Sequence, residues 1–346
     1  MKKLDPDGIH NWIGNLVNPQ KNKFIFCGVD DDDCAIINLG KIKIVITTDF
    51  LNSNPIVKEL GISSNWNLGR LLVAANLSDL CGTGAKPIAM LTSLMFKKGT
   101  LEKEFKEFIK GIKFELDKYK IPLIGGDTKL GVTDTFCGIA VGIGSEKCRL
   151  FPKNNAKPGD EIWLSGEVGS VSAAVLGLTS GEMSSSWEKW AKNVLLEPKL
   201  PLKKSLRVSN LNIGNGGTDI SDGLGKNIYD LCESSNVGAV IFADQIPVNS
   251  RCSQLSSKIE IPLWSFAFNI GGDFQFIVTG LKRHKNKFKQ LGFYQIGEIT
   301  KSNKKILVTS ATKKIPLPKT GHTDLNIKSF SNEVATFIHS TQKLIR

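Results

Sequence analysis

The sequence predicts two domains that each combine β-strands with α-helices, in α+β or α/β layers. The length of 346 residues is enough for two domains of ordinary size. Strand-like and helix-like patterns alternate in both halves of the chain. A stretch rich in Pro, Lys and Asn over residues 151–159 separates the halves, so we expect domains at 1–150 and 151–346.

Composition and charge narrow the class of protein. Hydrophobic residues make up 41% and charged residues 23%, as in a folded globular protein. The net charge of +12 comes from lysines spread along the whole chain, which favours a solvated surface over a nucleic-acid partner. No apolar run reaches the roughly 18 residues of a membrane span. Seven scattered cysteines without a C-x-x-C pair indicate a reducing compartment, so we expect a cytoplasmic protein without a membrane partner.

The first predicted element is a β-hairpin. Strands over Cys34–Leu39 and Lys41–Ile46 flank a turn at Gly40. Aspartates 30–33 precede the first strand and Asp49 follows the second, so acidic side chains meet at one end of the hairpin. Such a run is either a solvated turn or a metal site, and the opposing Asp49 favours metal.

A polar stretch over residues 50–66 is typical of a loop or lid. From Asn67 the apolar spacing predicts a helix that carries Asn76 and Asp79 and ends at the glycines of Cys81–Gly84. The polar pair either satisfies N–H groups at the helix end or approaches a phosphate.

Three strands and one helix complete the first half. We expect a strand at Ile88–Phe96, an amphipathic helix over 101–116, a strand at Ile121–Ile124 and a strand at Thr135–Gly144. The strand at Ile121–Ile124 is followed by Gly125-Gly126-Asp127-Thr128. An Asp after two glycines at a strand end would point out of the sheet into a cleft.

The second half continues with mixed elements. The patterns predict a strand at Glu161–Leu164, helices near 170–178, 187–196 and 203–211, a strand at Val237–Phe242, a pair of strands within Phe266–Val278 and a terminal helix near Val334–Leu344.

The stretch Thr218–Leu224 places two carboxylates and a hydroxyl just before a predicted helix. Asp219, Ser221 and Asp222 would cluster at the helix N-terminus, where hard oxygen ligands and the helix end suit a metal-bound phosphate. The same residues could instead cap the helix, and this stretch alone does not decide between the two.

Acidic residues beside glycines or at element ends recur along the chain. No P-loop, dinucleotide-binding or protein-kinase motif is found. We expect the acidic positions to bind several Mg²⁺ ions that bridge nucleotide phosphates, and they are Asp32, Asp49, Asp79, Asp127, Asp219, Asp222 and, as a further candidate, Asp273.

The order of these motifs resembles the thiamine-monophosphate kinase family. The series D-D-x-A, T-T-D, N-L-S-D-L-x-x-x-G-A-x-P, G-G-D-T, D-I-S-D-G-L and a late G-G-D-F is collinear with that family over roughly residues 28–280. Aminoimidazole ribonucleotide synthetase, selenophosphate synthetase and the hydrogenase maturation dehydratase share its superfamily.

The resemblance implies a two-domain aminoimidazole ribonucleotide synthetase-like fold with a C-terminal α/β sandwich. It implies a homodimer whose N-terminal domains pair into a β-barrel, with ATP between the domains and transfer of its γ-phosphoryl group to thiamine monophosphate. It also implies site residues: catalytic Asp222, Ser221 and Asp219; Mg²⁺ ligands Asp32, Asp33, Asp49, Asp79, Asp127, Asp219 and Asp222; ATP contacts Asn76, Gly125, Gly126, Asp127 and Thr128; substrate contacts Asp273 and Phe274.

The chain departs from the family pattern at its substrate-contact segments. Residues 52–57 lack the family's G-V-H-F histidine, G-G-E-D-Y-E-L is shortened at 271–276, and the C-terminal aromatic segment is reduced at 321–325. We expect ATP and thiamine monophosphate, or a similar small anionic molecule, as ligands. The alternatives are another ATP-dependent member of the superfamily, similar to aminoimidazole ribonucleotide synthetase, that acts on a different small molecule, and a non-catalytic nucleotide-binding protein.

Overall fold

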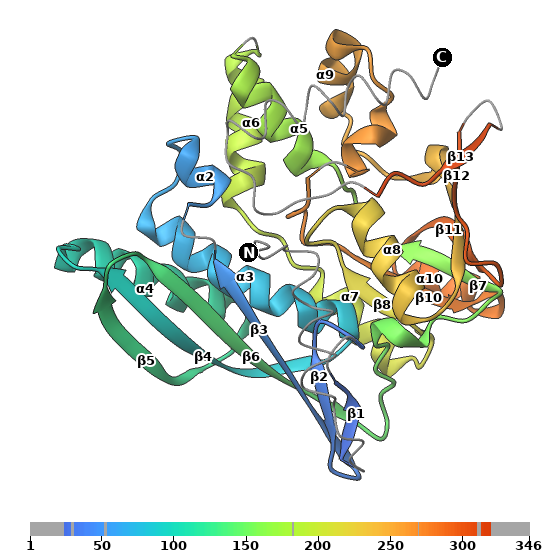
Figure 1. Ribbon diagram of the computed structural model, residues 1–346, viewed down its shortest axis with the longest axis horizontal. Helices are drawn as coiled ribbons and strands as arrows, with labels where there is room; N and C mark the ends of the chain where they lie inside the picture. The colour runs from blue at the N-terminus through green and yellow to red at the C-terminus, as the bar shows by residue number, and fades with distance from the viewer. Residues whose placement is uncertain are drawn as a thin grey trace, which may run out of the picture.

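The computed structural model describes residues 24–28, 31–51, 54–181, 183–268, 270–309 and 313–319. Two mixed sheets dominate this part of the chain (Figure 1). The first runs β1-β2-β3-β6-β4-β5, with β1 at Ile25–Cys27, β2 at Ala35–Asn38, β3 at Ile42–Leu51, β4 at Lys86–Lys97, β5 at Leu123–Gly131 and β6 at Thr135–Ser145. The predicted hairpin is confirmed as β2 and β3, which pair antiparallel.

Helices α3 (Asn65–Thr83) and α4 (Glu102–Tyr119) pack on the first sheet. They approach closely because glycines take the contact positions: a Cβ at Gly69 would lie 2.1 Å from the Phe108 carbonyl oxygen, and one at Gly111 2.0 Å from that of Trp66. Residues 50–66, expected to be a loop, contain the one-turn helix α2 at Ile56–Glu59.

The second sheet runs β13-β12-β9-β11-β7-β10-β8. Its strands are β7 at Asp160–Leu164, β8 at Gly217–Asp219, β9 at Gly238–Phe242, β10 at Phe276–Leu281, β11 at Tyr294–Thr300, β12 at Lys305–Val308 and β13 at Lys314–Pro316. The helices of this half are α5 at Ser170–Ser180, α6 at Ser185–Leu196, α7 at Leu202–Asn210, α8 at Leu224–Ser234, α9 at Cys252–Ile259 and α10 at Lys285–Gln290, with 3₁₀ turns η1 at Lys153–Asn155, η2 at Ala243–Gln245, η3 at Leu263–Phe268 and η4 at Lys282–His284. The expectation that strands combine with helices in both halves is confirmed.

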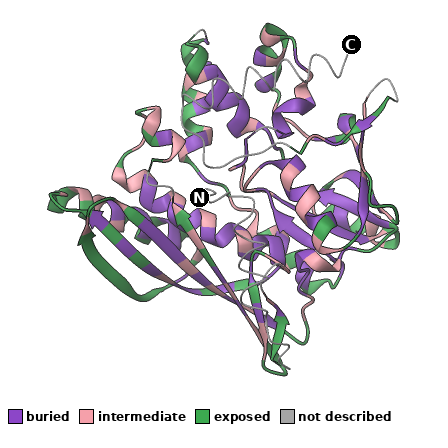
Figure 2. Ribbon diagram, viewed as in Figure 1, coloured by how far each residue is buried: buried purple, intermediate pink, exposed green. Residues whose placement is uncertain are grey.

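Helix α3 lies at the centre of the molecule (Figures 1 and 2). It begins at Asn65, two residues earlier than predicted, because Ser64 and Asn67 form a capping box there. Most of its residues are buried, since the first sheet and α4 cover one side while β8, β10 and α7 contact the other. The helix therefore joins the two halves.

One predicted strand was too short, one was wrong, and one predicted helix lies outside the described residues. The strand expected at Ile121–Ile124 runs on through Asp127 to Gly131, because this whole segment pairs parallel with β4. Residues 266–268 belong to η3 and not to a strand, since a short buried apolar run does not distinguish a strand from a helical turn. The helix expected near 334–344 falls outside the described part of the chain.

Candidate active site

Carboxylates from both halves of the chain meet where α3 lies against β8. Asp33 precedes β2, Asp79 lies on α3 and Asp219 ends β8. Burial, followed by the charges of Asp219, Asp33 and Asp49, raises the pKa of Asp79 well above its ordinary value. Burial and the charge of Asp33 raise the pKa of Asp219 to about 8, with smaller contributions from Asp222 and Asp49. We call Asp32, Asp33, Asp79 and Asp219 the acidic cluster.

Hydroxyl groups hold the carboxylates of the acidic cluster. Thr47 Oγ1 donates to Asp79 at 2.5 Å, and Ser78 Oγ donates to Asp219 at 2.6 Å. Longer hydrogen bonds run from Thr218 to Asp33 at 3.2 Å and from Thr83 to Asp32 at 3.3 Å. Four different donors thus fix four acidic side chains, which limits how far the carboxylates can turn away from one another.

Lys153 places one cation against the acidic cluster. Its Nζ lies 2.6 Å from Asp33 Oδ1, and its backbone N–H donates to Asp32. Desolvation opposes the charge on Lys153, but the two aspartates outweigh it and raise its pKa. Burial and the charge of Asp33 likewise raise the pKa of Asp32 to about 6. Sequence reasoning missed Lys153 because it lies in the Pro, Lys and Asn stretch that was taken only as a domain boundary.

Asn76 and Asp49 are joined through the backbone. The Asn76 side chain is fully buried; its Oδ1 accepts from the Asp49 backbone N–H at 3.1 Å, and its Nδ2 donates to the Leu72 carbonyl at 2.9 Å. A Cβ at Gly138 would lie 2.2 Å from Asn76 Nδ2, so this side chain has little space to move. Asn76 therefore holds the end of β3 against α3.

The motif at 219–222 is packed against the loop at 271–273. A Cβ at Gly271 would lie 1.7 Å from the Ser221 carbonyl oxygen, so only glycine allows this approach. Ser221 Oγ lies 3.4 Å from Asp219 Oδ1, and Gly223 is the N-cap residue of α8. The structure thus brings two of the predicted motifs together in the second half of the chain.

Asp273 is engaged at the N-terminus of α5. Its carboxylate accepts backbone N–H groups of Gly169 at 2.6 Å and Val171 at 3.1 Å. Burial raises its pKa to about 6, although these hydrogen bonds act in the opposite direction. Phe274, the next residue, has a left-handed backbone with φ 51°. The substrate role that the resemblance implied for the pair stays a prediction.

Gly125, Gly126, Asp127 and Thr128 lie apart from the acidic cluster. They belong to β5, which is exposed along its length at the edge of the first sheet (Figure 2). Asp127 forms an ion pair with Lys129 at 2.9 Å. It aligns with Ser93, Cys137 and Phe50 on successive strands, so about 14 Å of sheet separates it from the Asp49 end of β3.

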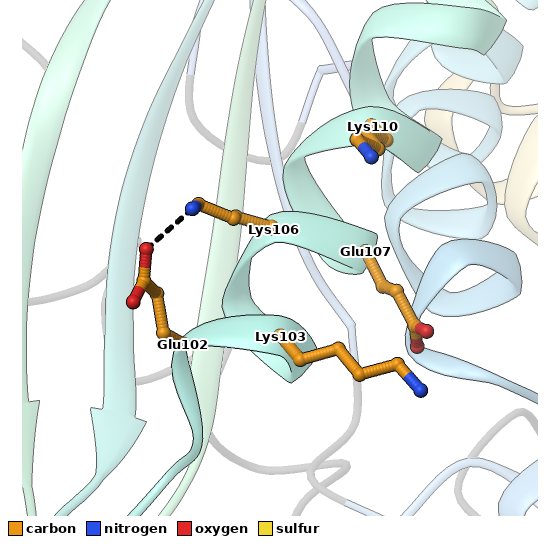
Figure 3. Close-up of a pocket in the computed structure, with 5 residues that line it drawn as sticks. All are labelled: Glu102, Lys103, Lys106, Glu107 and Lys110. Atoms are coloured by element: carbon orange, nitrogen blue, oxygen red, sulfur yellow. Dashed lines mark ion pairs between the residues drawn. The ribbon is translucent and has the colours of Figure 1, made fainter.

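Two surface hollows lie elsewhere on the first half. One of about 340 Å³ follows the exposed face of α4, where Glu102 pairs with Lys106 (Figure 3). Another of about 200 Å³ is lined by Phe96, Phe105 and residues 128–130 among others. Neither includes a member of the acidic cluster, and solvated lysine and glutamate side chains on one helix offer no reactive arrangement. Among the described residues, no helix is both long and apolar enough to cross a membrane.

Family models match most of the chain. The model for the N-terminal domain of AIR synthase related proteins matches residues 31–144, and the model for their C-terminal domain matches residues 157–310. Together they leave a short unmatched segment around Lys153.

Individual relatives give a narrower comparison. A thiamine-monophosphate kinase from Pyrococcus horikoshii is 32% identical over 250 residues, covering 72% of this chain and 76% of the relative. One from Buchnera aphidicola subsp. Schizaphis graminum is 31% identical over 332 residues, covering 90% and 96%. The solved structure of AaThiL complexed with AMPPCP and TMP is 22% identical with a TM-score of 0.78, covering 94% of this chain and 99% of the other, which shows a shared fold.

Proposed function

The chain belongs to the thiamine-monophosphate kinase family of AIR synthase related proteins, and we propose that it transfers the γ-phosphoryl group of ATP to thiamine monophosphate, forming thiamine diphosphate. The observation that carries this function is the convergence of acidic side chains from both halves of the chain around α3, beside the buried Lys153. ATP is the co-substrate. Phosphoryl transfer between two anions depends mainly on positioning and on neutralising charge, and carboxylates that hold Mg²⁺ beside Lys153 would supply both.

We propose that the acidic cluster holds Mg²⁺. The donor set consists of hard carboxylate oxygens, and burial together with neighbouring negative charges raises the pKa values of Asp79 and Asp219, so a cation would favour their ionised forms. No three acidic, His or Cys side chains form a ready metal cage among the described residues. Mg²⁺ commonly takes one or two carboxylates and completes its shell with phosphate oxygens and water, so pairs of these aspartates suffice. The proposed ligands are Asp32, Asp33, Asp49, Asp79, Asp219 and Asp222.

Chain residues other than the carboxylates would orient the phosphates. Lys153, held against Asp33, supplies a fixed positive charge for a phosphate oxygen. Asp222 and Ser221 precede α8, whose N-terminal N–H groups favour an anion. We propose that Asp219, Ser221 and Asp222 act at the reacting phosphate, and that Asn76 contributes by fixing Asp49.

The acceptor side of the site is proposed at the loop of Asp273 and Phe274. This loop contacts the 219–222 motif through Gly271, and that contact supports a position beside the proposed reacting centre. The Asp273 carboxylate is occupied by the α5 backbone, so we propose that it fixes the loop and that a substrate contact comes from the residues around it.

We further propose a homodimer in which the first sheets of two subunits form a barrel. β5 is an exposed edge strand that carries the solvent-exposed Ile124 (59%) and Leu130 (65%), and Phe50 of β3 in the same sheet is 63% exposed. A second subunit would cover them. The separation of about 14 Å between Asp127 and the end of β3 within one chain supports a role for the partner's strand. Gly125, Gly126, Asp127 and Thr128 would then bind ATP and Mg²⁺ at a site of the other subunit.

Light scattering after size exclusion tests the dimer. Ile124→Asp should give a monomer that has lost turnover, whereas Leu211→Asp, a matched change at a 42% exposed leucine of the second half, should leave a dimer. A wild-type monomer with full activity would contradict the shared site.

The structure also supports the two remaining expectations as proposals. A domain boundary between residues 150 and 151 falls between β6 and β7 and between the two family models. A cytoplasmic location agrees with seven free thiols and with the use of ATP.

The function is tested with purified protein, ATP, Mg²⁺ and thiamine monophosphate. Chromatography should show thiamine diphosphate forming in step with ADP. Asp222→Asn should reduce turnover more than about a hundredfold without changing the unfolding temperature, while Asp244→Asn, the same change at an exposed site on η2, should have no effect. ADP release that thiamine monophosphate does not stimulate would refute the proposed acceptor.

A further inference from the structure

We propose that Ser78 is a positioning residue that orients the Asp219 carboxylate toward the bound cation. The inference rests on the proposed function, and it assigns a role to a residue of the N-L-S-D-L motif that the reaction itself leaves unexplained. Ser78 Oγ donates to Asp219 Oδ2 at 2.6 Å, and both residues are 1% exposed. Because Ser78 lies on α3 and Asp219 on β8, this hydrogen bond links the two halves of the molecule.

The backbones on either side fix the geometry of this hydrogen bond. Gly82 follows Ser78 by one helical turn and therefore faces the same way. A Cβ at Gly82 would lie 2.4 Å from the Asp219 backbone nitrogen, and one at Gly217 would lie 2.7 Å from the Gly82 carbonyl oxygen. Helix α3 and strand β8 are thus in direct backbone contact, and this contact fixes the position of the Ser78 hydroxyl relative to the Asp219 carboxylate.

The Ser78 hydrogen bond leaves one of the two Asp219 carboxylate oxygens available to a cation. Asp219 Oδ2 is occupied by the short Ser78 hydrogen bond, whereas Oδ1 has the 3.4 Å contact with Ser221. The Ser78 hydroxyl therefore fixes the rotation of the carboxylate and leaves Oδ1, which has only the longer contact, available to a cation. Partners that orient ligating carboxylates in this way typically change metal affinity or activity by 10- to 100-fold when removed.

Ser205 offers a matched control. Its hydroxyl donates to the Cys81 carbonyl of α3 at 2.7 Å and is fully buried. It also joins the second half to α3, but it contacts no carboxylate. Ser205→Ala therefore removes a buried hydroxyl from the same interface without touching the acidic cluster.

The test compares Ser78→Ala with Ser205→Ala. Mn²⁺ binding, read by electron paramagnetic resonance without nucleotide, should weaken about tenfold in Ser78→Ala and stay at the wild-type level in Ser205→Ala. In turnover assays, the Mg²⁺ concentration for half-maximal rate should rise about tenfold in Ser78→Ala, with the KM for thiamine monophosphate unchanged. If Ser78→Ala does not fold, Ser78→Cys keeps the volume with a weaker donor and should show the same direction.

Several results would overturn the role of Ser78. They are unchanged Mn²⁺ binding in Ser78→Ala, an equal loss in Ser205→Ala, and absence of Mn²⁺ binding in the wild type. A wild-type protein that binds Mn²⁺ but forms no thiamine diphosphate refutes only the proposed acceptor, and the Mn²⁺ comparison still decides the role of Ser78.

Discussion

Gly82→Ala tests whether the contact between α3 and β8 sets the site. In an unconstrained helix this change stabilises by about 1 kcal/mol, because alanine has the higher helix propensity. Here the new Cβ would lie 2.4 Å from the Asp219 backbone nitrogen, about 1 Å closer than an ordinary contact. The atoms it meets are backbone, so α3 or β8 must move. Overpacking of this kind costs about 1 to 3 kcal/mol, which outweighs the propensity gain.

The expected outcome is a loss in both stability and activity. A net cost of up to about 2 kcal/mol lowers the unfolding temperature by up to about 8 °C. A shift of about 1 Å in β8 moves Asp219 relative to Asp79, and displacements of that size at a reacting centre cost about a hundredfold in rate. The assays are thermal unfolding and the Mg²⁺ dependence of turnover.

Gly69→Ala separates the two effects. It lies on the same helix, and its Cβ would meet the Phe108 carbonyl oxygen at 2.1 Å, but that contact is with α4 and not with β8. Gly69→Ala should lower stability while the remaining folded enzyme keeps the wild-type Mg²⁺ dependence. A Gly82→Ala variant that is as stable and as active as the wild type would refute the reasoning.

Three further predictions concern charge. The pKa of about 8 for Asp219, above its ordinary 3.8, means that the folded chain keeps a proton that the unfolded chain releases. The stability that this proton contributes is therefore lost as the pH rises toward 8. Because Mg²⁺ binds the ionised carboxylate, it should raise the unfolding temperature more at pH 8.5 than at pH 6. An equal rise at the two pH values would contradict this prediction. Lys153→Met should lower kcat/KM for ATP at least about tenfold in steady-state assays, and Lys153→Arg should retain most of it. Arg70→Met should cost about 3 kcal/mol in urea unfolding, because the fully buried Glu115 then keeps only the partly exposed Lys118 as a cationic partner. Glu197→Gln, at a 49% exposed side chain, should cost under about 1 kcal/mol.

Local sequence patterns predicted the elements whose apolar residues follow a regular strand or helix spacing. The β2–β3 hairpin followed from two apolar runs around Gly40, and α3 from its apolar spacing. The strand at 135–144 and the helix before it were also found, since each is long and periodic. Element ends were less predictable, because β5 continues past its apolar residues only through pairing with β4.

The site was predictable as a set of residue types but not as a geometry. Aspartates beside glycines pointed to phosphate chemistry, yet no local pattern shows that Asp79 and Asp219 meet while Asp127 lies on a distant edge strand. Lys153 carried no motif of its own, and its role appears only when the chain between the domains folds back onto Asp33. Contacts made across 120 residues of sequence have no signal in a pattern read over short windows.

The acidic cluster lies at the junction of the two halves, so metal binding is linked to the packing of α3 against β8. Without a cation, burial and neighbouring negative charges disfavour the ionised forms of Asp79 and Asp219, which the glycine contact between α3 and β8 holds close together. The close packing and the Ser78 hydrogen bond must therefore offset that cost in the free protein. A cation with nucleotide phosphates removes the cost, because each carboxylate then gains a positive partner and its ionised form is favoured. Ligand binding should thus stabilise the junction more than either half alone, and the residues that hold α3 to β8 should affect metal affinity even where they touch no metal.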